Sequence, residues 1–348
     1  MRILCLSLSS FDKVGGIQTF NNFFYKALNQ NKLNYKVISL HDKFSPDKHV
    51  HVCHSSYIKF FYLLCKYSNH NTVNVWQHIS LTFFLPIIKI FIKPKRNILT
   101  LYGTEVWGKK LSFIKKIGLT KIDQYWCISN YTANQILKKY NIEKQKIKIF
   151  PCCIDIPKKL VKQKNPYKTK AFNILSILRL DKSGKLNAIF EILKAMSYIK
   201  KSKIDIHFTI LGDGNYKKKI IQIINENNLR DKVSLLGYVE DTRPYIEHCD
   251  LFTLTSPLEG FGIVYLEAML YKKACISSKN CGSEDVVLHK RTGYSIESND
   301  IKELSHIIKK MNSEKKYKNK LGVNGYNHLI KNFTFTKFKE NQLKLLSL

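Results

Sequence analysis

The sequence predicts an α/β protein built from two doubly wound domains. The chain has 348 residues, which is long for one hydrophobic core and sufficient for two. Short apolar runs alternate with helical patterns, as expected for parallel strands joined by crossover helices. Residues 157–170 are polar and basic, carry two prolines and have no apolar periodicity, which is typical of a hinge. We therefore expect domains at residues 1–160 and 161–330, with a final helix over 331–348 that packs back on the first domain.

The first domain is expected to contain seven strands. They are residues 2–7, 35–40, 50–53, 73–77, 98–102, 125–128 and 146–150. One helix is expected from Ile17 to about Gln30, after a Gly15-Gly16 turn, and another from Asn130, where a serine or asparagine can cap it.

A second alternating set follows the hinge. Its expected strands are residues 172–178, 204–211, 233–236, 251–255 and 274–277, and its expected helices are 188–199, 216–227 and 262–271, with further helix over 301–348. Two Rossmann-like halves of this kind would leave a cleft between the carboxyl ends of their sheets, where ligands of such folds bind.

Positive charge dominates the composition and is concentrated in the first half of the chain. The sequence has 58 Lys and Arg residues against 26 Asp and Glu, a formal net charge of +32 at pH 7. Residues 1–165 hold 27 of the basic and 7 of the acidic residues, and no carboxylate side chain lies between Asp47 and Glu105. Such a field suits a phosphate-rich partner, either an anionic membrane surface or nucleic acid. The alternative, a general bias toward lysine, would not concentrate the charge in one half.

Cysteine use and hydropathy indicate a cytoplasmic protein. The nine cysteines are odd in number and lack paired spacing, so the sequence predicts neither a disulfide framework nor a zinc site. The N-terminal apolar run is short and lacks a signal-peptide cleavage site. The longest apolar stretch, residues 79–92, is interrupted by Pro86 and Lys89 and is too short to span a bilayer. A peripheral position on the inner face of the membrane is compatible with the charge.

Two basic segments of the first domain, residues 83–93 and 109–116, interleave lysines with apolar and aromatic residues. One interpretation is shallow docking on an anionic leaflet, which would present a lipid-linked acceptor. The other interpretation is that both segments are core strands and helices whose lysine side chains extend to solvent.

The segment 256–267, SPLEGFGIVYLE, carries the strongest functional signal. It follows an expected strand and runs into a helix, with Glu259 in the turn and Glu267 on the helix. Glycines let a backbone approach a ligand closely, and the free N–H groups around Gly262 and Ile263 would hold a diphosphate. Glu267 lies about 7.5 Å along the helix from Gly262, so one carboxylate could bind hydroxyl groups at each end of a diphosphate-bridged ligand. The alternative for Glu267 is an ordinary surface carboxylate.

The run Glu259-Gly260-Phe261-Gly262, followed by Glu267, resembles the paired-glutamate motif of family 4 retaining glycosyltransferases, within glycosyl transferases group 1. Weaker resemblance covers the whole chain, including segments 176–181, 210–214, 236–239 and 281–286. It implies a GT-B fold, in which two Rossmann-like domains face a central cleft. It also implies retaining transfer of a sugar from a nucleotide-diphosphate sugar to a glycan or lipid-linked acceptor, in cell-surface polysaccharide or lipopolysaccharide biosynthesis.

The resemblance also implies roles for the residues of this segment. Glu259 and the backbone amides of Phe261, Gly262 and Ile263 would hold the donor sugar and its phosphates. Glu267 would bind the ribose hydroxyls.

A departing nucleoside diphosphate needs positive charge where no metal is bound. By the resemblance, Arg179 and Lys185 supply this charge. Lys182 is a second candidate, because Leu186 stands where the family usually has glycine after the lysine.

Two further glycine-containing segments match the family. Gly15 and Gly16 correspond to its glycine turn near the donor phosphates. Gly237 and Tyr238 correspond to the segment that contacts the nucleotide base, although Tyr238 could equally be a core or surface residue.

Tyr102 stands where many relatives carry a functional histidine. Tyrosine can donate a hydrogen bond to a sugar hydroxyl, but it is a poor proton shuttle near neutral pH. His78, at the end of the preceding strand, is a candidate to compensate, and the alternative is a structural histidine. We place both residues on the acceptor or sugar side of the site.

No Asp-x-Asp motif occurs, so a metal-chelated diphosphate is not predicted, and no cofactor is expected beyond the nucleotide-sugar substrate. Three alternatives remain. A basic nucleic-acid-binding protein lacks support because the motifs of common RNA and DNA modules are missing, and no nucleic acid partner is expected. A catalytically inactive GT-B partner of another transferase is supported by Tyr102 alone. A nucleotide-sugar epimerase shares the two-domain shape but is disfavoured by the paired glutamates.

Overall fold

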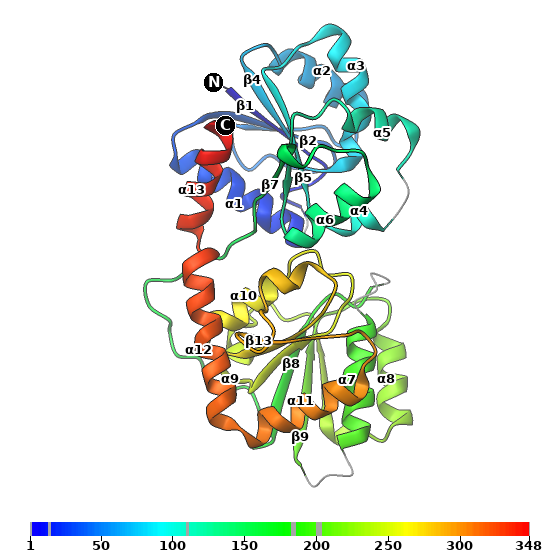
Figure 1. Ribbon diagram of the computed structural model, residues 1–348, viewed down its shortest axis with the longest axis vertical. Coiled ribbons are helices and arrows are strands. Elements are labelled where there is room, and N and C mark those ends of the chain that lie inside the picture. Colours follow the sequence, from blue (N-terminus) through cyan, green and yellow to red (C-terminus); the bar gives the residue numbers. More distant parts are fainter. Residues whose placement is uncertain (1, 13–14, 109–110, 182–185, 200–203, 348) are drawn as a thin grey trace. The chain divides into compact units, whose positions relative to one another are not determined.

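The computed structural model describes residues 2–12, 15–108, 111–181, 186–199 and 204–347, and the chain divides into two compact units. Unit 1 comprises Met1–Cys153 and Phe335–Leu348, and unit 2 comprises Ile154–Thr334 (Figure 1). The sequence placed the boundaries at 160/161 and 330/331. Residues 157–170, expected as a hinge, are thus part of unit 2.

The sheet of unit 1 has seven parallel strands in the order β3-β2-β1-β4-β5-β6-β7. They are β1 (Arg2–Ser7), β2 (Asn34–Ser39), β3 (Val50–Val52), β4 (Thr72–Trp76), β5 (Arg96–Leu101), β6 (Gln124–Cys127) and β7 (Ile147–Ile149). All seven expected strands are present, and their ends differ from prediction by two residues or fewer. The order from β3 to β6 is that of the Rossmann fold.

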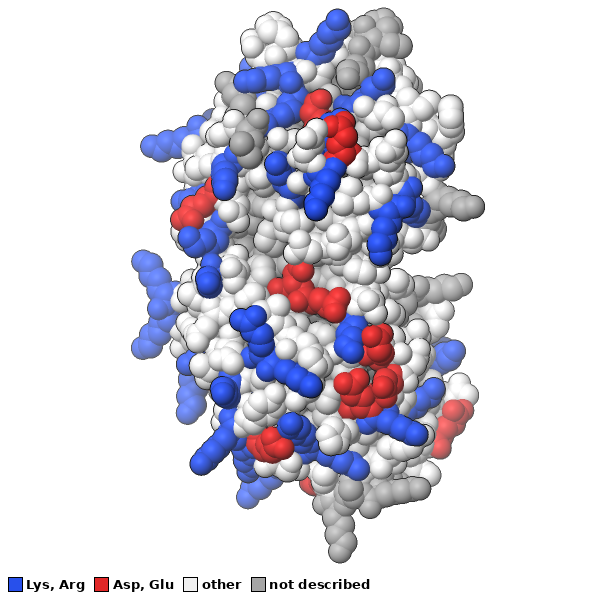
Figure 2. Space-filling model, in the orientation of Figure 1, with Lys and Arg blue, Asp and Glu red and all other residues white. Residues whose placement is uncertain are grey.

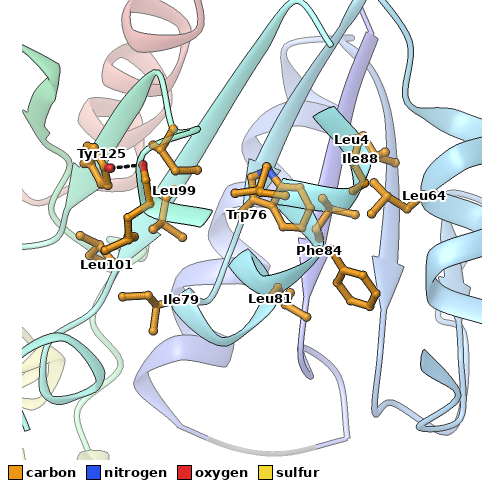
Figure 3. Close-up of a cluster of buried hydrophobic side chains, with 14 of the residues drawn as sticks. Leu4, Leu64, Trp76, Ile79, Leu81, Phe84, Ile88, Leu99, Leu101 and Tyr125 are labelled. Atoms are coloured by element: carbon orange, nitrogen blue, oxygen red, sulfur yellow. Dashed lines mark hydrogen bonds between the residues drawn. The ribbon is translucent and has the colours of Figure 1, made fainter. Parts of the chain in front are cut away.

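Helices cover both faces of this sheet because successive strand residues point to opposite sides. The helices are α1 (Gly16–Gln30), α2 (Tyr57–Tyr67), η1 (Ile79–Phe84), α3 (Leu85–Phe91), α4 (Thr104–Trp107), α5 (Phe113–Leu119), α6 (Asn130–Lys139), η2 (Lys144–Lys146) and α13 (Phe335–Ser347). On one face, strand residues such as Leu4 and Trp76 pack against Leu81 and Phe84 of η1 (Figure 3). On the other face, α13 packs on α1, and Phe338 stacks on Phe150 with ring centroids 4.5 Å apart.

Unit 2 repeats the same topology with six parallel strands in the order β10-β9-β8-β11-β12-β13. They are β8 (Phe172–Ile177), β9 (Ile206–Leu211), β10 (Val233–Gly237), β11 (Leu251–Leu254), β12 (Ala274–Ser278) and β13 (Gly293–Ile296). Its helices are α7 (Leu186–Ile199), α8 (Lys217–Glu226), η3 (Arg230–Lys232), α9 (Arg243–His248), α10 (Ile263–Leu270), η4 (Gly282–Asp285), α11 (Ile301–Ser313) and α12 (Lys315–Asn332). The prediction of two doubly wound Rossmann-like domains is therefore confirmed.

β13 was not predicted from the sequence. Its four residues, Gly-Tyr-Ser-Ile, are short and half polar, so they give no strand pattern of their own. The strand forms because β12 offers a parallel edge, along which Cys275 to Ser278 pair with Gly293 to Ile296. None of the helices in the described part of the chain combines the length and the hydrophobicity needed to cross a membrane.

Candidate active site

The strand order of unit 2 reverses between β8 and β11, which are hydrogen-bonded neighbours. Chain connections leave these two strands in opposite directions, and doubly wound folds bind ligands in the crevice at the carboxyl ends of such strands. Arg179 follows β8, and Glu259 follows β11. The fold thus brings to one end of the sheet two predicted catalytic residues that are 80 positions apart in the sequence.

A rigid turn places Glu259 at this position. Glu259 is buried, and its carbonyl oxygen accepts a hydrogen bond of 2.7 Å from the backbone N–H of Gly282, in the loop after β12. Gly262 caps α10 with a φ of 91°, in the left-handed region. A Cβ at this position would lie 2.4 Å from the ring of Tyr265, so only glycine fits without rearrangement. Tyr265 is in turn fixed, because its hydroxyl donates to the carbonyl oxygen of Leu254.

Phe261 and Ile263 flank this glycine. The Phe261 side chain is buried and packs edge-on against Phe333, with ring centroids 5.5 Å apart. Phe261 therefore anchors the turn in the core of unit 2, and only its backbone remains for a ligand. Ile263 begins α10, where the first backbone N–H groups have no partner within the helix.

Glu267 lies on α10 in a desolvated position. Burial raises the pKa of its carboxyl group to about 7. No hydrogen bond or ion pair joins this carboxyl group to another of the residues that the structure describes. A desolvated carboxylate without a protein partner favours a ligand that donates hydrogen bonds, such as a sugar with adjacent hydroxyl groups.

Arg179 is free to meet an anion. Its side chain is 73% exposed, and its Nε lies 3.6 Å from Oδ2 of Asp181. An exposed pair at this distance contributes little energy, so an incoming phosphate can compete for the guanidinium. The predicted phosphate ligands Lys182 and Lys185 lie outside the described residues.

Gly237 ends β10 and Tyr238 follows it, at the carboxyl end of a strand of the same parallel sheet. Gly237 has a φ of 76°, and its carbonyl oxygen accepts a hydrogen bond of 2.7 Å from Gly212. Tyr238 is exposed and so belongs to the surface rather than to the core. Beside Gly237 lies an ion pair that the sequence did not single out, between Lys217 Nζ and Asp213 Oδ2 at 4.0 Å.

In unit 1, Gly16 begins α1 and Gly15 is its N-cap. A buried carboxylate, Asp42, holds residues 9–12, which lie after β1. Its oxygens accept hydrogen bonds from the Ser9 and Ser39 hydroxyls and from the backbone N–H groups of residues 10, 11 and 12, at 2.7 to 3.3 Å. Burial alone would raise the pKa of Asp42, but these hydrogen bonds lower it below its ordinary value. Asp42 has no recognisable signal in the sequence, because most of its hydrogen-bond donors are about thirty residues away.

Tyr102 is buried inside unit 1. Its hydroxyl donates a hydrogen bond of 2.8 Å to Oδ1 of Asn21, whose amide donates to the hydroxyl of Ser10. Burial raises the pKa of Tyr102 well above its ordinary value. Tyr102 is thus neutral and already hydrogen-bonded within the protein.

His78 caps η1. Its Nδ1 accepts a hydrogen bond of 3.0 Å from the backbone N–H of Ser80. Burial and the charge of Lys115 lower the pKa of His78 to about 4, so the ring is neutral at physiological pH. These contacts support the structural alternative for this histidine.

Comparison with known proteins finds a match to one family model and several proteins of similar sequence. Residues 157–328 match the model of the family Glycosyl transferases group 1. An uncharacterized glycosyltransferase of Methanocaldococcus jannaschii is 26% identical over 235 residues, which cover 66% of this chain and 62% of that protein. The N-acetylgalactosamine-N,N'-diacetylbacillosaminyl-diphospho-undecaprenol 4-alpha-N-acetylgalactosaminyltransferase of Campylobacter jejuni is 28% identical over 197 residues, covering 55% and 52%. The chain thus spans between half and two thirds of the length of these relatives.

Solved structures show the same fold. HepE of Anabaena, in complex with UDP and glucose, aligns over 100% of this chain and 99% of its own with a TM-score of 0.79 and 17% identity. The lipopolysaccharide outer core galactosyltransferase WaaB, in its apo form, aligns over 100% of both chains with a TM-score of 0.79 and 18% identity. The predicted GT-B fold class is confirmed by these structures together with the two Rossmann-like sheets.

Proposed function

Residues 157–328 carry the match to Glycosyl transferases group 1, and from this premise we propose that the chain is a retaining glycosyltransferase of family 4. It transfers a hexose-type sugar from a nucleotide-diphosphate sugar to a glycan or lipid-linked acceptor. One observation carries the proposal. Glu259 and Glu267 flank the backbone turn at Gly262, which follows β11, and Arg179 follows β8, the neighbouring strand at the point where the sheet order reverses.

Each group has a defined task in this proposal. Glu259 accepts hydrogen bonds from the donor sugar, and Glu267 accepts them from the ribose hydroxyls. The first N–H groups of α10 and the guanidinium of Arg179 bind the diphosphate, and Lys182 and Lys185 are assigned to the same task by the sequence resemblance alone. By the resemblance, Gly15 and Gly16 correspond to the family's glycine turn near the donor phosphates, and Gly237 and Tyr238 correspond to the segment that contacts the base.

Transfer proceeds by attack on the same face that the nucleotide leaves. The bond between the anomeric carbon and the donor phosphate oxygen breaks, and the acceptor oxygen forms its bond on that face. The acceptor proton passes to a donor phosphate oxygen, and the nucleoside diphosphate departs with its charge balanced by Arg179 without a metal ion. Tyr102 and His78 fit this proposal, because neither is in a state to relay a proton near neutral pH.

The relatives suggest the substrates. HepE is seen with UDP and glucose, and the Campylobacter relative acts on a diphospho-undecaprenol acceptor, as does an Escherichia coli alpha-1,3-galactosyltransferase that uses UDP-Gal. We therefore assign a UDP-sugar donor and a lipid-linked acceptor in cell-surface polysaccharide or lipopolysaccharide assembly. The nine free thiols support a reducing, cytoplasmic location.

Thermal unfolding in the presence of UDP, GDP, ADP, CMP and their sugars tests the donor site, with Glu267→Gln measured beside the wild type. We expect UDP to stabilise the wild type, and Glu267→Gln to bind it about 10 to 100-fold more weakly, because the neutral amide loses charge-assisted hydrogen bonds. Glu226→Gln, an exposed glutamate at the end of α8, is the matched control. If no nucleotide stabilises the wild type while RNA or DNA binds tightly, the nucleic-acid alternative replaces this proposal.

Glu267→Gln should also change the pH dependence of folding stability in the absence of ligand. The raised pKa of Glu267 means that folding loses stability as pH rises from about 4.5 to about 7, and the loss persists above that range. Glu267→Gln should therefore be more stable than the wild type by about 1 to 3 kcal/mol at pH 8, and equal to it near pH 4. A variant that loses both ligand binding and stability would indicate a structural role instead.

Unit 1 also presents a surface suited to an anionic membrane, although only part of it coincides with the predicted segments. Within residues 83–93, Phe84, Leu85 and Ile88 belong to the hydrophobic core, so the core interpretation is confirmed for these three residues. Residues 109–110 lie outside the described part of the chain. Exposed apolar side chains are nevertheless found in both predicted segments, at Ile87 in the first and at Phe113 and Ile114 of α5 in the second, and others lie on α2.

On α2 and α5, five large apolar or aromatic residues are exposed among lysines. Tyr57, Ile58, Tyr62, Phe113 and Ile114 are 50, 85, 60, 76 and 55% exposed. Both helices contact η1, so they share one side of the unit 1 sheet. Their lysines are Lys59, Lys66, Lys115 and Lys116. On the face drawn in Figure 2, basic side chains are distributed widely and acidic ones gather in a few places. Exposed apolar side chains interspersed with lysines are typical of proteins that bind the surface of anionic membranes.

Sedimentation with vesicles tests this surface. We expect wild-type protein to bind vesicles of phosphatidylcholine mixed with phosphatidylglycerol, and to bind phosphatidylcholine alone weakly. The double variant Ile58→Ser, Phe113→Ser should bind mixed vesicles at least about tenfold more weakly, because each side chain loses about 1.5 to 3 kcal/mol of burial. The matched variant Ile221→Ser, Val323→Ser removes exposed apolar residues from unit 2 and should bind like the wild type. Equal loss in both variants would contradict the assignment.

A further inference from the structure

Unit 2 contains a cavity of about 680 Å³ that involves none of the predicted site residues. One wall is the segment 288–292, which connects η4 to β13, and the other is a polar face of α12. The lining residues are Leu288, Lys290, Arg291, Thr292, Lys320, Asn324, Asn327, His328, Lys331 and Asn332. Four of these residues are cationic, none is a carboxylate and one is aliphatic. The composition excludes an apolar ligand and a metal ion, and it fits an anion.

The cations of this cavity have no internal counterion. Within the described residues, none of Lys290, Arg291, Lys320 and Lys331 forms an ion pair. Lys318 on the same helix is different, because its Nζ lies 2.6 Å from Oδ1 of Asp250. The sequence of α12 also lacks carboxylate side chains, since residues 315–339 contain no Asp or Glu. Four unneutralised cations around one cavity raise the local concentration of anions.

The walls of the cavity are fixed in place. Asn324 Nδ2 donates a hydrogen bond of 2.9 Å to the carbonyl oxygen of Arg291, and His328 Nε2 lies 3.1 Å from the carbonyl oxygen of Asp285. On the opposite side of α12, a Cβ on Gly322 would lie 1.9 Å from the carbonyl oxygen of Lys272, which shows how closely the helix is packed. The backbone of the cavity is therefore preformed, and a ligand would order mainly the exposed side chains of Lys290, Arg291, Lys320 and Lys331.

The shape of the cavity indicates an elongated ligand. Lys320 and Lys331 are eleven residues apart on α12, three helical turns, or about 16 Å along the axis. The residues between them that line the cavity are asparagines and one histidine, and the asparagine amides donate hydrogen bonds. One phosphate cannot reach both ends, whereas a chain of phosphoryl groups can. Nucleic acid fits less well, because the lining has no Phe, Tyr or Trp ring on which a base could stack.

We propose that this cavity, which we call the α12 groove, is a binding site for an elongated anion bearing several phosphoryl groups. The site is separate from the candidate active site and does not depend on sugar transfer. The two are connected through the backbone. His328 contacts the carbonyl oxygen of Asp285, and Gly282, three residues earlier, donates to the carbonyl oxygen of Glu259.

Calorimetric titration of the full chain with inorganic tripolyphosphate at physiological salt tests the proposal. Wild-type protein should bind saturably, orthophosphate should bind much more weakly, and longer polyphosphate should bind more tightly. Lys320→Gln, Lys331→Gln should weaken tripolyphosphate binding at least about tenfold, since two charge-assisted contacts are lost. Lys315→Gln, Lys316→Gln removes the same charge from the first turn of α12, outside the groove, and should change the affinity less than about twofold.

Two further measurements distinguish binding in the α12 groove from binding at other sites. Tripolyphosphate should still bind in the presence of saturating UDP, because UDP would fill the donor site and leave the α12 groove open. A single-stranded oligonucleotide with the same number of phosphates should bind more weakly than polyphosphate. The proposal is overturned by absence of saturable binding, by equal loss in the two lysine pairs, by loss of binding in the presence of UDP, or by tighter oligonucleotide binding. None of these outcomes bears on sugar transfer, which the nucleotide measurements test separately.

Discussion

Glu259→Gln should reduce sugar transfer by about 10² to 10³-fold in kcat while leaving the protein folded. Glutamine keeps the shape of glutamate but not its charge. As the bond to the leaving phosphate breaks, positive charge develops on the sugar, and a nearby carboxylate stabilises it more than an amide does. The buried position of Glu259 strengthens this effect, because little water is present to screen the charge.

The measurement is release of nucleoside diphosphate from the donor that the nucleotide screen identifies, followed with and without acceptor lipid. Glu297→Gln is the matched control, since it makes the same substitution at an exposed position after β13. We expect this control to retain wild-type kcat. Nucleotide affinity of Glu259→Gln should stay within a few-fold of wild type, which separates a role in the reaction from a role in binding. An unchanged kcat would remove Glu259 from the proposed mechanism.

Asp42→Ala should lower the free energy of unfolding of unit 1 by about 3 to 5 kcal/mol, because it leaves several buried donors without an acceptor. Three of these donors are consecutive backbone N–H groups in the loop that leads to Gly15 and Gly16. The lowered pKa of Asp42 gives the sign of the pH dependence. Its stabilisation is present above its ordinary pKa and is lost as pH falls through the lowered value.

Urea unfolding followed by tryptophan fluorescence measures this effect selectively, because all three tryptophans, Trp76, Trp107 and Trp126, lie in unit 1. Asp47→Ala is the control, since Asp47 is exposed and bonds only locally to the N–H of His49. Its expected cost is about 0.5 kcal/mol or less. If Asp42→Ala unfolds within about 1 kcal/mol of the wild type, the loop is held by other contacts. Nucleotide affinity measured on the folded variant would then show whether the loop still matters for the donor.

Much of the fold could be predicted because buried parallel strands leave a local pattern in the sequence. Among the described residues, twelve of the thirteen strands coincide with apolar runs separated by helical periodicity. The exception, β13, has too few apolar residues to be seen and depends on pairing with β12. The Glu259 to Glu267 segment was also visible, because a turn and the helix that follows it are contiguous, and their spacing fixes their geometry.

Contacts between distant residues were not visible in the same way. The carboxylate of Asp42 meets Ser9 and residues 10 to 12 only after β1 and β2 have paired. Similarly, Tyr102 was expected on the acceptor side, and the structure shows its hydroxyl bonded to Asn21 in the interior. Neither hydrogen bond has a signature in the local sequence, because each depends on which strands become neighbours.

The sequence by itself determined the two doubly wound sheets and the paired glutamates with their glycine turn, since these depend on short-range periodicity and backbone conformation. Only the tertiary structure decided which apolar side chains face solvent, which lysines lack counterions and which residues meet at the strand-order reversal. Ile58 and Ile88 are alike in sequence, yet one is exposed on α2 and the other is buried against η1. The physical reason is that burial and charge pairing depend on the sum of long-range contacts, which no local pattern specifies.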